Sequence, residues 1–302
     1  MRIGVLIGAE GSPLPDVIAQ VRAAAEAGLD SAFFTQTFSW DAVGLAALVA
    51  REVPGIDVGT AVTQTYPRHP LALAGQALTA QAASGNRFTL GVGPSHPEII
   101  EERFGHSYDR PARHVREYLT ALVPLLRGEQ VDHHGEVLTA VGRVGVPGAA
   151  PPPVLLAALG PVMLRIAGEL ADGTVTVWTG PRWIGERIAP AIGRAAERAG
   201  RPAPRVVAGV VVSVTDDPDG VRQRVATTLG GAGRQPAYRS VLDGQGMSGV
   251  HETVIAGDES TVERAIRAYA DAGATELVAS STGDEGDRAR TLAFLAALRT
   301  RL

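Results

Sequence analysis

Short apolar runs of strand length alternate with helical patterns along nearly the whole chain. Segment 151–181 contains one clear unit: Val154 to Leu159 predicts a strand, Pro161 to Ala171 a helix, and Thr174 to Thr179 a second strand. The first run is wholly apolar, the second has apolar residues at helical spacing, and the third is rich in β-branched residues. A strand, a crossover helix and a second strand form a parallel βαβ unit, which constrains the chain to an α/β fold.

Six further apolar runs extend this alternation to both ends of the chain. Eight strands alternating with helices predict a (β/α)8 TIM barrel, and no break in composition divides residues 1–302 into more than one domain. The further strands are predicted at Ile3–Gly8, Ser31–Gln36, Val58–Thr63, Phe88–Val92, Arg205–Val214 and Glu276–Ser280. The further helices are predicted at Leu14–Ala27, Asp41–Glu52, Pro70–Ser84, Pro111–Arg127, Arg182–Ala199, Pro218–Leu229, Ser260–Ala272 and Asp284–Leu302.

Insertions interrupt the alternation after the fourth and the seventh strands. Gly93 to Arg110 predicts a long loop with a short helix at Ile99 to Phe104, and Gln130 to Gly145 predicts a polar hairpin. Ala232 to His251 has many glycines and no clear period, so we expect a loop or lid there. In a barrel the active site lies at the carboxyl ends of the strands, so both insertions are expected beside it.

The composition predicts a soluble, cytoplasmic protein. A hydrophobic fraction of 45% suffices for a full core, and a net charge of −4 without a basic run argues against a nucleic-acid partner. No apolar segment reaches membrane-spanning length, and the chain begins in a predicted strand without a signal peptide. We therefore expect no membrane partner.

Residues that the chain lacks exclude several kinds of chemistry. It has no cysteine, which excludes disulfides, thiolate metal sites, iron–sulfur clusters and cysteine nucleophiles. All 28 basic residues are arginine, so neither a Schiff-base lysine nor a Walker-type phosphate lysine is present. The histidines have no metal-ligand spacing, no GxSxG motif occurs, and no GxGxxG motif joins a predicted strand to a predicted helix as a dinucleotide-binding fingerprint does. We predict no metal site.

The turn formed by Leu159, Gly160, Pro161 and Val162 joins a predicted strand to a predicted helix at the expected active face. The first turn of a helix leaves N–H groups unpaired and has a partial positive charge, which suits a phosphate. Proline is favourable there because its missing N–H would be unpaired anyway. The turn is therefore a candidate anion site, although glycine turns also join strands to helices without binding a ligand.

A second candidate segment, Gly91 to His96, leaves the fourth strand at the same face. Its glycines would let a flat cofactor approach the backbone closely, and His96 could donate a proton or a hydrogen bond. The alternative interpretation is that Ser95 and His96 only cap the short helix that follows.

Aromatic and basic residues near other strand ends are candidates for ligand contacts. Trp178, at the end of the sixth strand, could wall an aromatic ring system, and Trp40, after the second strand, could wall the substrate. Tyr66 follows the third strand. Arg234 and Tyr238 in the predicted lid could hold an anionic substrate, although a solvated loop is the alternative.

Three sets of motifs carry a resemblance to a known family. The first is RFTLGVG at 87–93 followed by SHPE at 95–98, and the second is ALGPVML at 158–164 followed by AGE at 167–169 and ADG at 171–173. Between them lie YDRP at 108–111, EYL at 117–119 and LLRGE at 125–129. These segments resemble the bacterial luciferase-like superfamily and, within it, the F420-dependent oxidoreductases similar to methylenetetrahydromethanopterin reductase. The resemblance extends nearly from end to end.

The resemblance implies a barrel that binds a flavin-shaped cofactor across its strand ends, with F420 expected and FMN as the alternative. It also implies a homodimer. The cofactor phosphate would lie on Leu159 to Val162, and a non-prolyl cis peptide bond at Ala61–Val62, beside Thr63, would support the reactive ring. The complete set of expected contacts is Gln36, Ala61, Val62, Thr63, Gly91, Gly93, Leu159, Gly160, Pro161, Val162, Trp178 and Thr179 for the cofactor, and Trp40, Tyr66, Arg234 and Tyr238 for the substrate.

The chain departs from the family pattern at the positions that would oxidise an alcohol. Family members that oxidise sugar phosphates have an Asp–His pair after strand two, where this chain has Gln36 and Thr37, and a glutamate after strand four, where it has Pro94. They hold the substrate phosphate with lysines, which this chain lacks. Because no base remains for a hydroxyl proton, we predict a reductase that transfers hydride from reduced F420 to an activated C=C or C=N bond. The proton would come from His96, Thr37, a lid residue or water.

Two other functions are compatible with the sequence. An FMN-dependent luciferase-like monooxygenase would keep the fold and activate oxygen. A non-catalytic barrel would bind the cofactor for storage or partner contact. The sequence leaves the identity of the small-molecule substrate open.

Overall fold

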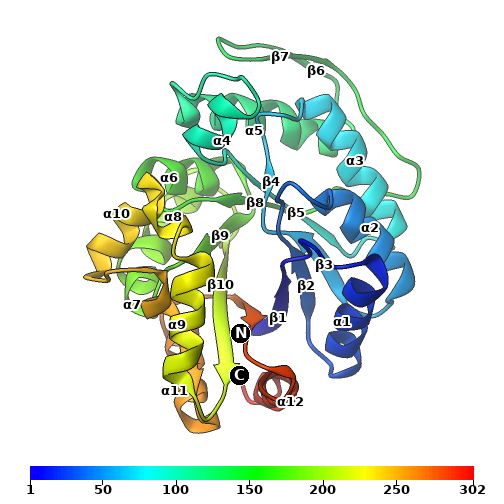
Figure 1. Cartoon of the computed structure of the whole chain (residues 1–302). Coiled ribbons are helices and arrows are strands. Elements are labelled where there is room, and N and C mark those ends of the chain that lie inside the picture. Colours follow the sequence, from blue (N-terminus) through cyan, green and yellow to red (C-terminus); the bar gives the residue numbers. More distant parts are fainter.

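Eight parallel strands close into a barrel in the computed structural model, which describes residues 1–302 (Figure 1). Each strand pairs with its neighbour in chain order, and β12 pairs with both β10 and β1, which closes the ring. The predicted (β/α)8 barrel is therefore confirmed. Its strands are β1 (Arg2–Ile7), β2 (Ser31–Phe34), β3 (Asp57–Thr60), β5 (Phe88–Gly93), β8 (Val154–Ala157), β9 (Gly173–Val177), β10 (Arg205–Val214) and β12 (Glu276–Ser281).

Helices surround the barrel, as Figure 1 shows, and begin close to the predicted residues. Asp41 and Asp284 each accept a backbone N–H of the helix they precede, which satisfies one of its unpaired donors. The surrounding helices are α1 (Leu14–Glu26), α2 (Ala42–Glu52), α3 (Pro70–Ala83), α5 (Pro111–Leu126), α6 (Pro161–Leu170), α8 (Ala189–Arg198), α9 (Pro218–Leu229), α11 (Glu259–Asp271) and α12 (Glu285–Arg299). None of them is both long and apolar enough to cross a membrane.

Two predicted elements are interrupted. The strand predicted at Val58–Thr63 ends at Thr60, and β4 (Thr63–Gln64) resumes the pairing with β5 beyond a cis peptide bond. That bond joins Ala61 and Val62, as the resemblance implies. The helix predicted at Arg182–Ala199 consists of α7 (Pro181–Trp183), a π-helical turn at Ile184–Ile188, and α8.

A loop or lid was expected at Ala232–His251; the insertion after β10 is helical, so the expectation that it lacks regular structure was wrong. It contains a 3-10 turn (Ala232–Arg234), α10 (Pro236–Gln245) and a second 3-10 turn (Val250–Thr253). Leu242 and Val250 are fully buried in a small apolar cluster. This tertiary packing stabilises the helix, although the glycine-rich sequence has no clear helical period. The sequence analysis also missed β11 (Ile255–Gly257), which extends the sheet beside the end of β10.

The insertion after β5 has the two predicted parts. The short helix α4 (Pro97–Glu102) begins two residues earlier than predicted, at a proline suited to a first helical turn. The hairpin of β6 (Val131–His134) and β7 (Thr139–Gly142) is antiparallel and extends away from the barrel (Figure 1). Its turn is anchored by Glu117 of α5, whose carboxylate accepts three backbone N–H groups.

Candidate functional site

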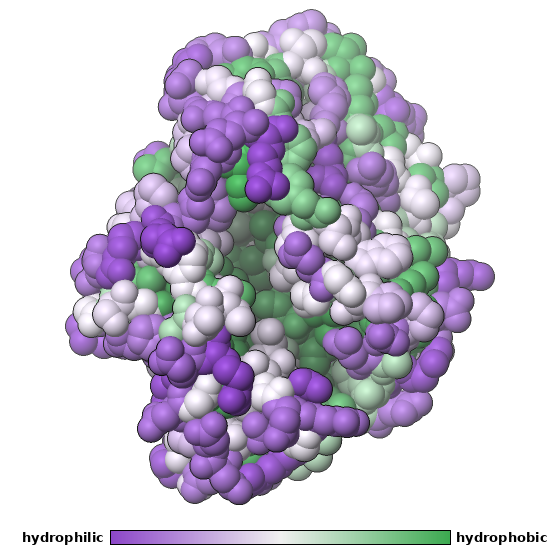
Figure 2. Space-filling model, in the orientation of Figure 1, coloured by the Kyte–Doolittle hydropathy of each residue, from purple (hydrophilic) through white to green (hydrophobic).

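The mouth of the barrel is a hollow with an apolar floor. Figure 2 shows the hollow at the centre of this face, with hydrophobic residues at its base. Inside the barrel, a buried cluster that includes Leu155 and Val175 supports four partly exposed side chains. These four side chains, which we call the floor, are Leu6, Ala61, Val62 and Ala157. An apolar floor with polar groups around it suits a flat ring system.

Gly91 and Gly93 bring backbone and floor into close contact. A Cβ at Gly91 would overlap the carbonyl oxygen of Thr60, and one at Gly93 would lie 2.8 Å from Cγ2 of Val62 and 3.0 Å from Cβ of Ala157. Close packing thus explains why glycine, which has no Cβ, occupies both positions. Thr63, beside the cis peptide bond, is fully buried, and its hydroxyl has no hydrogen-bond partner. A buried unpaired hydroxyl is rare, and this one lies beside the floor.

The amino-terminal turn of α6 is open. Gly160 precedes it without a side-chain cap, and Pro161 and Val162 are exposed. The first N–H of this helix with a protein acceptor is that of Leu164, which donates to the carbonyl of Gly160 at 2.9 Å. A Cβ at Gly160 would have no atom within 4 Å. Unpaired N–H groups facing open space fit a phosphate, as predicted from the helix terminus.

The turn after β9 is tightly held. Trp178 has a φ of 58°, in the left-handed region that few residues with a Cβ occupy. The Thr179 carbonyl accepts a hydrogen bond from the hydroxyl of Tyr269 at 2.8 Å, and the hydroxyls of Thr179 and Thr176 are 2.9 Å apart. The Trp178 side chain is half-buried and packs against the apolar cluster of the α10 insertion.

Gln36 organises the loop after β2. Its Oε1 accepts the N–H of Ala42 at 2.9 Å, and its Nε2 donates to the carbonyl of Thr37 at 2.9 Å. Trp40 is tied to a neighbouring loop, because its Nε1 donates to the carbonyl of Ser12 at 3.0 Å. The side-chain amide of Gln36 and the indole N–H of Trp40 therefore already have hydrogen-bond partners within the protein. The hydroxyl of Thr37 makes no hydrogen bond.

An aromatic cluster forms one wall near the end of β4. Tyr66 stacks on His114 with a centroid distance of 3.7 Å, and it lies 5.3 Å from Tyr108. Burial lowers the pKa of His114 to about 4, so its ring is neutral near pH 7. Burial and nearby carboxylates raise the pKa of Tyr66 to about 12. The sequence analysis missed His114 and Tyr108, because only the fold brings their segments to Tyr66.

Two contacts connect the insertions across the mouth. The ring of His96 lies edge-on to that of Tyr238, with centroids 5.0 Å apart. Gln235 donates a hydrogen bond to Glu98 of α4 at 3.0 Å. The His96 side chain makes no capping hydrogen bond to α4, and burial lowers its pKa. Arg234, beside Gln235, is exposed and forms no ion pair.

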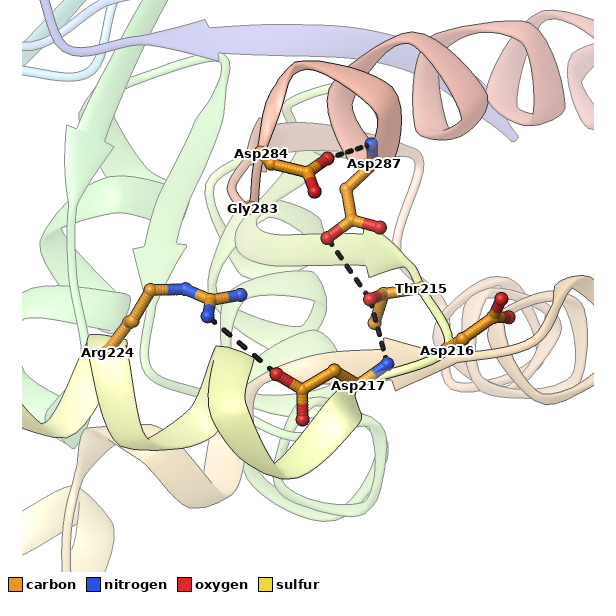
Figure 3. Close-up of a pocket in the computed structure, with 7 residues that line it drawn as sticks. All are labelled: Thr215, Asp216, Asp217, Arg224, Gly283, Asp284 and Asp287. Carbon is orange, nitrogen blue, oxygen red and sulfur yellow. Dashed lines mark hydrogen bonds and ion pairs between the residues drawn. The ribbon is translucent and has the colours of Figure 1, made fainter.

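A separate acidic groove of about 590 Å³ lies beside the ends of β10 and β12 (Figure 3). No hydrophobic residue lines it, and its carboxylates already have partners: Asp217 and Asp284 cap α9 and α12, and Asp287 accepts from Thr215. Nowhere in the chain do three histidine, aspartate or glutamate side chains gather where they could hold a metal ion. The mouth, rather than this groove, is the candidate active site, since it alone combines an apolar floor with an open helix terminus.

Comparison with known proteins identifies the family. A sequence model of the luciferase-like monooxygenase family matches residues 1–282. The chain belongs to this family. The resemblance inferred from the sequence motifs is thereby confirmed, and the family's match covers all eight barrel strands.

One sequence relative and two solved structures match nearly the whole chain. A putative coenzyme F420-dependent oxidoreductase of Mycobacterium tuberculosis is 28% identical and covers 98% of this chain and 99% of its own length. The solved structure of coenzyme F420-dependent tetrahydromethanopterin reductase from Methanopyrus kandleri has a TM-score of 0.83 at 22% identity, covering 98% of this chain and 97% of that one. An F420-dependent secondary alcohol dehydrogenase in complex with an F420–acetone adduct has a TM-score of 0.84 at 16% identity, with the same coverage. Because both structures are less than 25% identical to this chain, the comparison with them shows a shared fold.

Proposed function

We propose that this protein is an F420-dependent oxidoreductase that reduces an activated C=C or C=N bond of a small molecule. The observation that carries the proposal is the open amino-terminal turn of α6 beside an apolar floor. The turn offers unpaired N–H groups to a phosphate, and the floor offers a flat surface to a ring. The names of the M. tuberculosis relative and of the two solved structures support F420 as the cofactor.

The residues present fit such a cofactor. Leu159 to Val162 would hold its phosphate, and Ala61, Val62 and Gly93 would lie under its ring. The unpaired buried hydroxyl of Thr63 would find a partner in a polar ring edge. When bound in its reduced form, F420 supplies the hydride, and the protein then has to orient the acceptor, exclude water and deliver a proton.

The polar residues around the mouth favour reduction over alcohol oxidation. Oxidation of an alcohol needs a base for the hydroxyl proton. The Gln36 amide cannot act as that base, and it is held in hydrogen bonds of the β2 loop. His96 is a weak base because burial lowers its pKa. His96 and Thr37 are the candidate proton donors for a reduction, with Trp40, Tyr66, Arg234 and Tyr238 around the acceptor.

A second candidate is an FMN-dependent monooxygenase, which the description of the matched family favours. FMN also has a ring and a phosphate, so the same floor and helix terminus would fit it. A deazaflavin forms no oxygen adduct, so oxygen consumption separates the two functions. In either case we expect a homodimer.

The test is a titration of the purified protein with oxidised F420 and, separately, with FMN, followed by quenching of tryptophan fluorescence. Micromolar binding of F420 with weak binding of FMN supports the proposal. Reduced F420 is then assayed with activated alkenes and imines, and oxidised F420 with secondary alcohols. Tight FMN binding with oxygen consumption, or turnover of alcohols alone, would contradict it.

A further inference from the structure

Gln245, the last residue of α10, holds both ends of the turn that follows β9. Its Oε1 accepts a hydrogen bond from the N–H of Gly180 at 2.6 Å, and its Nε2 donates one to the carbonyl of Trp178 at 3.0 Å. Only this orientation of the amide satisfies both groups, since its oxygen can only accept and its nitrogen can only donate. One side chain from the insertion therefore fixes a turn of the barrel.

The fixed turn has an unfavourable backbone. Trp178 has a φ of 58°, which brings Cβ close to the following carbonyl. Conformations of this kind persist where the surrounding contacts determine them, and they cluster at functional sites. The middle of the turn is held by Tyr269 and Thr176, which contact Thr179. Gln245 contacts its two ends, at Trp178 and Gly180.

The helix that presents Gln245 is held in place by other contacts. Arg239 donates to the carbonyl of Met247 at 2.8 Å, which secures the chain directly after α10. Gly244 lies against the ring of Trp183, where a Cβ would overlap the ring. At its other end the insertion contacts α4 through Gln235. Gln245 thus links α10, whose Tyr238 lies against His96, to the end of strand β9.

We infer that Gln245 is a positioning residue for the cofactor: by holding Trp178 and Gly180, it couples the seating of the 232–253 insertion to the shape of the cofactor site. The inference rests on the proposed function and on the expectation, implied by the family resemblance, that Trp178 and Thr179 line the cofactor. The placement of the insertion and the affinity for the cofactor are then linked through two hydrogen bonds. Loss of either bond loosens the turn and weakens cofactor binding.

The sharpest test is Gln245→Glu. A glutamate has almost the same size and still accepts the N–H of Gly180, but when ionised it cannot donate to the carbonyl of Trp178 and it repels that oxygen. At pH 8 we expect the Kd for F420, relative to wild type at the same pH, to rise about tenfold. As the pH falls to about 4, below the ordinary pKa of a glutamate, the protonated carboxyl can donate again, so this ratio should return toward one.

Two further variants isolate the effect. Gln245→Met, which cannot form either hydrogen bond, should bind F420 weakly at both pH values. Gln223→Glu introduces the same charge at an exposed position on α9 and should match wild type at both. A wild-type Kd for Gln245→Glu at pH 8, or a raised Kd that does not fall toward the wild-type value at a pH of about 4, would overturn the inference.

A measurement without cofactor separates this inference from the proposed function. Hydrogen exchange of the Gly180 amide should be slow in wild type and faster in Gln245→Met at the same pH, because its acceptor is removed. If wild type binds neither F420 nor FMN, the proposed function fails, and the Gly180 exchange still decides whether Gln245 holds the turn. Unchanged exchange in Gln245→Met would overturn the positioning role.

Discussion

The imidazole of His96 lies edge-on to the phenol ring of Tyr238, with the two planes at 66°. His96 follows β5 and Tyr238 lies on α10, so the pair joins the two insertions at the mouth of the barrel. Burial lowers the pKa of His96 below its ordinary value of 6.5, although Glu98 opposes the shift. The ring is therefore mostly neutral near pH 7, and it becomes protonated only at pH values below 6.5.

The first prediction concerns this titration. If His96 delivers the proton, kcat for reduction should rise as the pH falls toward and below 6.5, because only the protonated ring is an effective acid. His96→Asn, which keeps an N–H donor but does not titrate, should flatten the profile and lower kcat at pH 6 by about a hundredfold. Steady-state rates from pH 5.5 to 8 with reduced F420 check this. An unchanged profile would assign the proton to Thr37, a residue of the insertion or water.

Gly160→Asp should raise stability and weaken cofactor binding together. An aspartate before α6 can accept a free N–H and interact favourably with the helix dipole, adding about 0.5 kcal/mol. The same carboxylate would repel a phosphate at that turn and raise the Kd for F420 at least about tenfold. Gly160→Ser, which caps without charge, is the matched control and should lose less binding. Thermal unfolding and fluorescence titration measure both effects, and undiminished binding by Gly160→Asp would remove the phosphate from this turn.

The two glycines of β5 should respond differently to alanine. At Gly91 the new methyl group meets the carbonyl of Thr60, a backbone atom that cannot move away, so Gly91→Ala should cost about 3 kcal/mol. At Gly93 it meets the side chain of Val62, which can shift, so Gly93→Ala should cost about 1 kcal/mol. Because Val62 belongs to the floor, Gly93→Ala should also raise the Kd for F420. Urea unfolding and titration test this; an unchanged Kd would exclude Val62 from the ring site.

The barrel was predictable from sequence because its signals are local. The strand at Val154, the proline-started helix α6 and the strand β9 each have their own period and their own boundary residues. The helix after Asp41 begins where its cap predicts. The cis bond at Ala61–Val62 was placed by resemblance alone, since no local pattern marks it.

The parts that the sequence concealed depend on contacts between distant segments. Strand β11 has three residues and exists because the end of β10 offers a pairing edge. Helix α10 includes Gly244, a poor helix former that is accommodated because the ring of Trp183 occupies the space of a side chain. The stacking of His114 on Tyr66, and the bonds from Gln245 to the β9 turn, likewise join residues that no local spacing relates.

A stability prediction concerns the opposite end of the barrel. Glu276 is fully buried there and accepts hydrogen bonds from the hydroxyl of Ser31 and, at 2.7 Å, from Arg205. Arg205→Met removes the guanidinium and leaves the carboxylate without its main partner, which should cost about 3 kcal/mol. Glu276→Gln keeps a hydrogen-bonding group without the buried charge and should cost about 1 kcal/mol. Urea unfolding measures both, and the Kd for F420 should not change, since the mouth lies at the other end.

The last prediction concerns His114, whose pKa burial lowers to about 4. Between pH 6.5 and about 4 the folded protein binds fewer protons at this residue than the unfolded chain, so stability falls as the pH falls through that window. His114→Phe keeps a ring against Tyr66 but cannot titrate. Its free energy of unfolding, relative to wild type, should therefore rise between pH 7 and 4.5 by about 1–2 kcal/mol, after a discount for partial exposure.

Urea unfolding at pH 7, 5.5 and 4.5 measures this difference. Val141→Phe, at an exposed position on the β6–β7 hairpin, adds an aromatic ring without removing a titratable group, so it is the control and should keep a nearly constant difference from wild type. The comparison between the two variants removes the contribution of carboxylates, which titrate in the same range in all three proteins. A pH-independent difference for His114→Phe would mean that His114 takes up its proton as readily in the folded protein as in the unfolded chain.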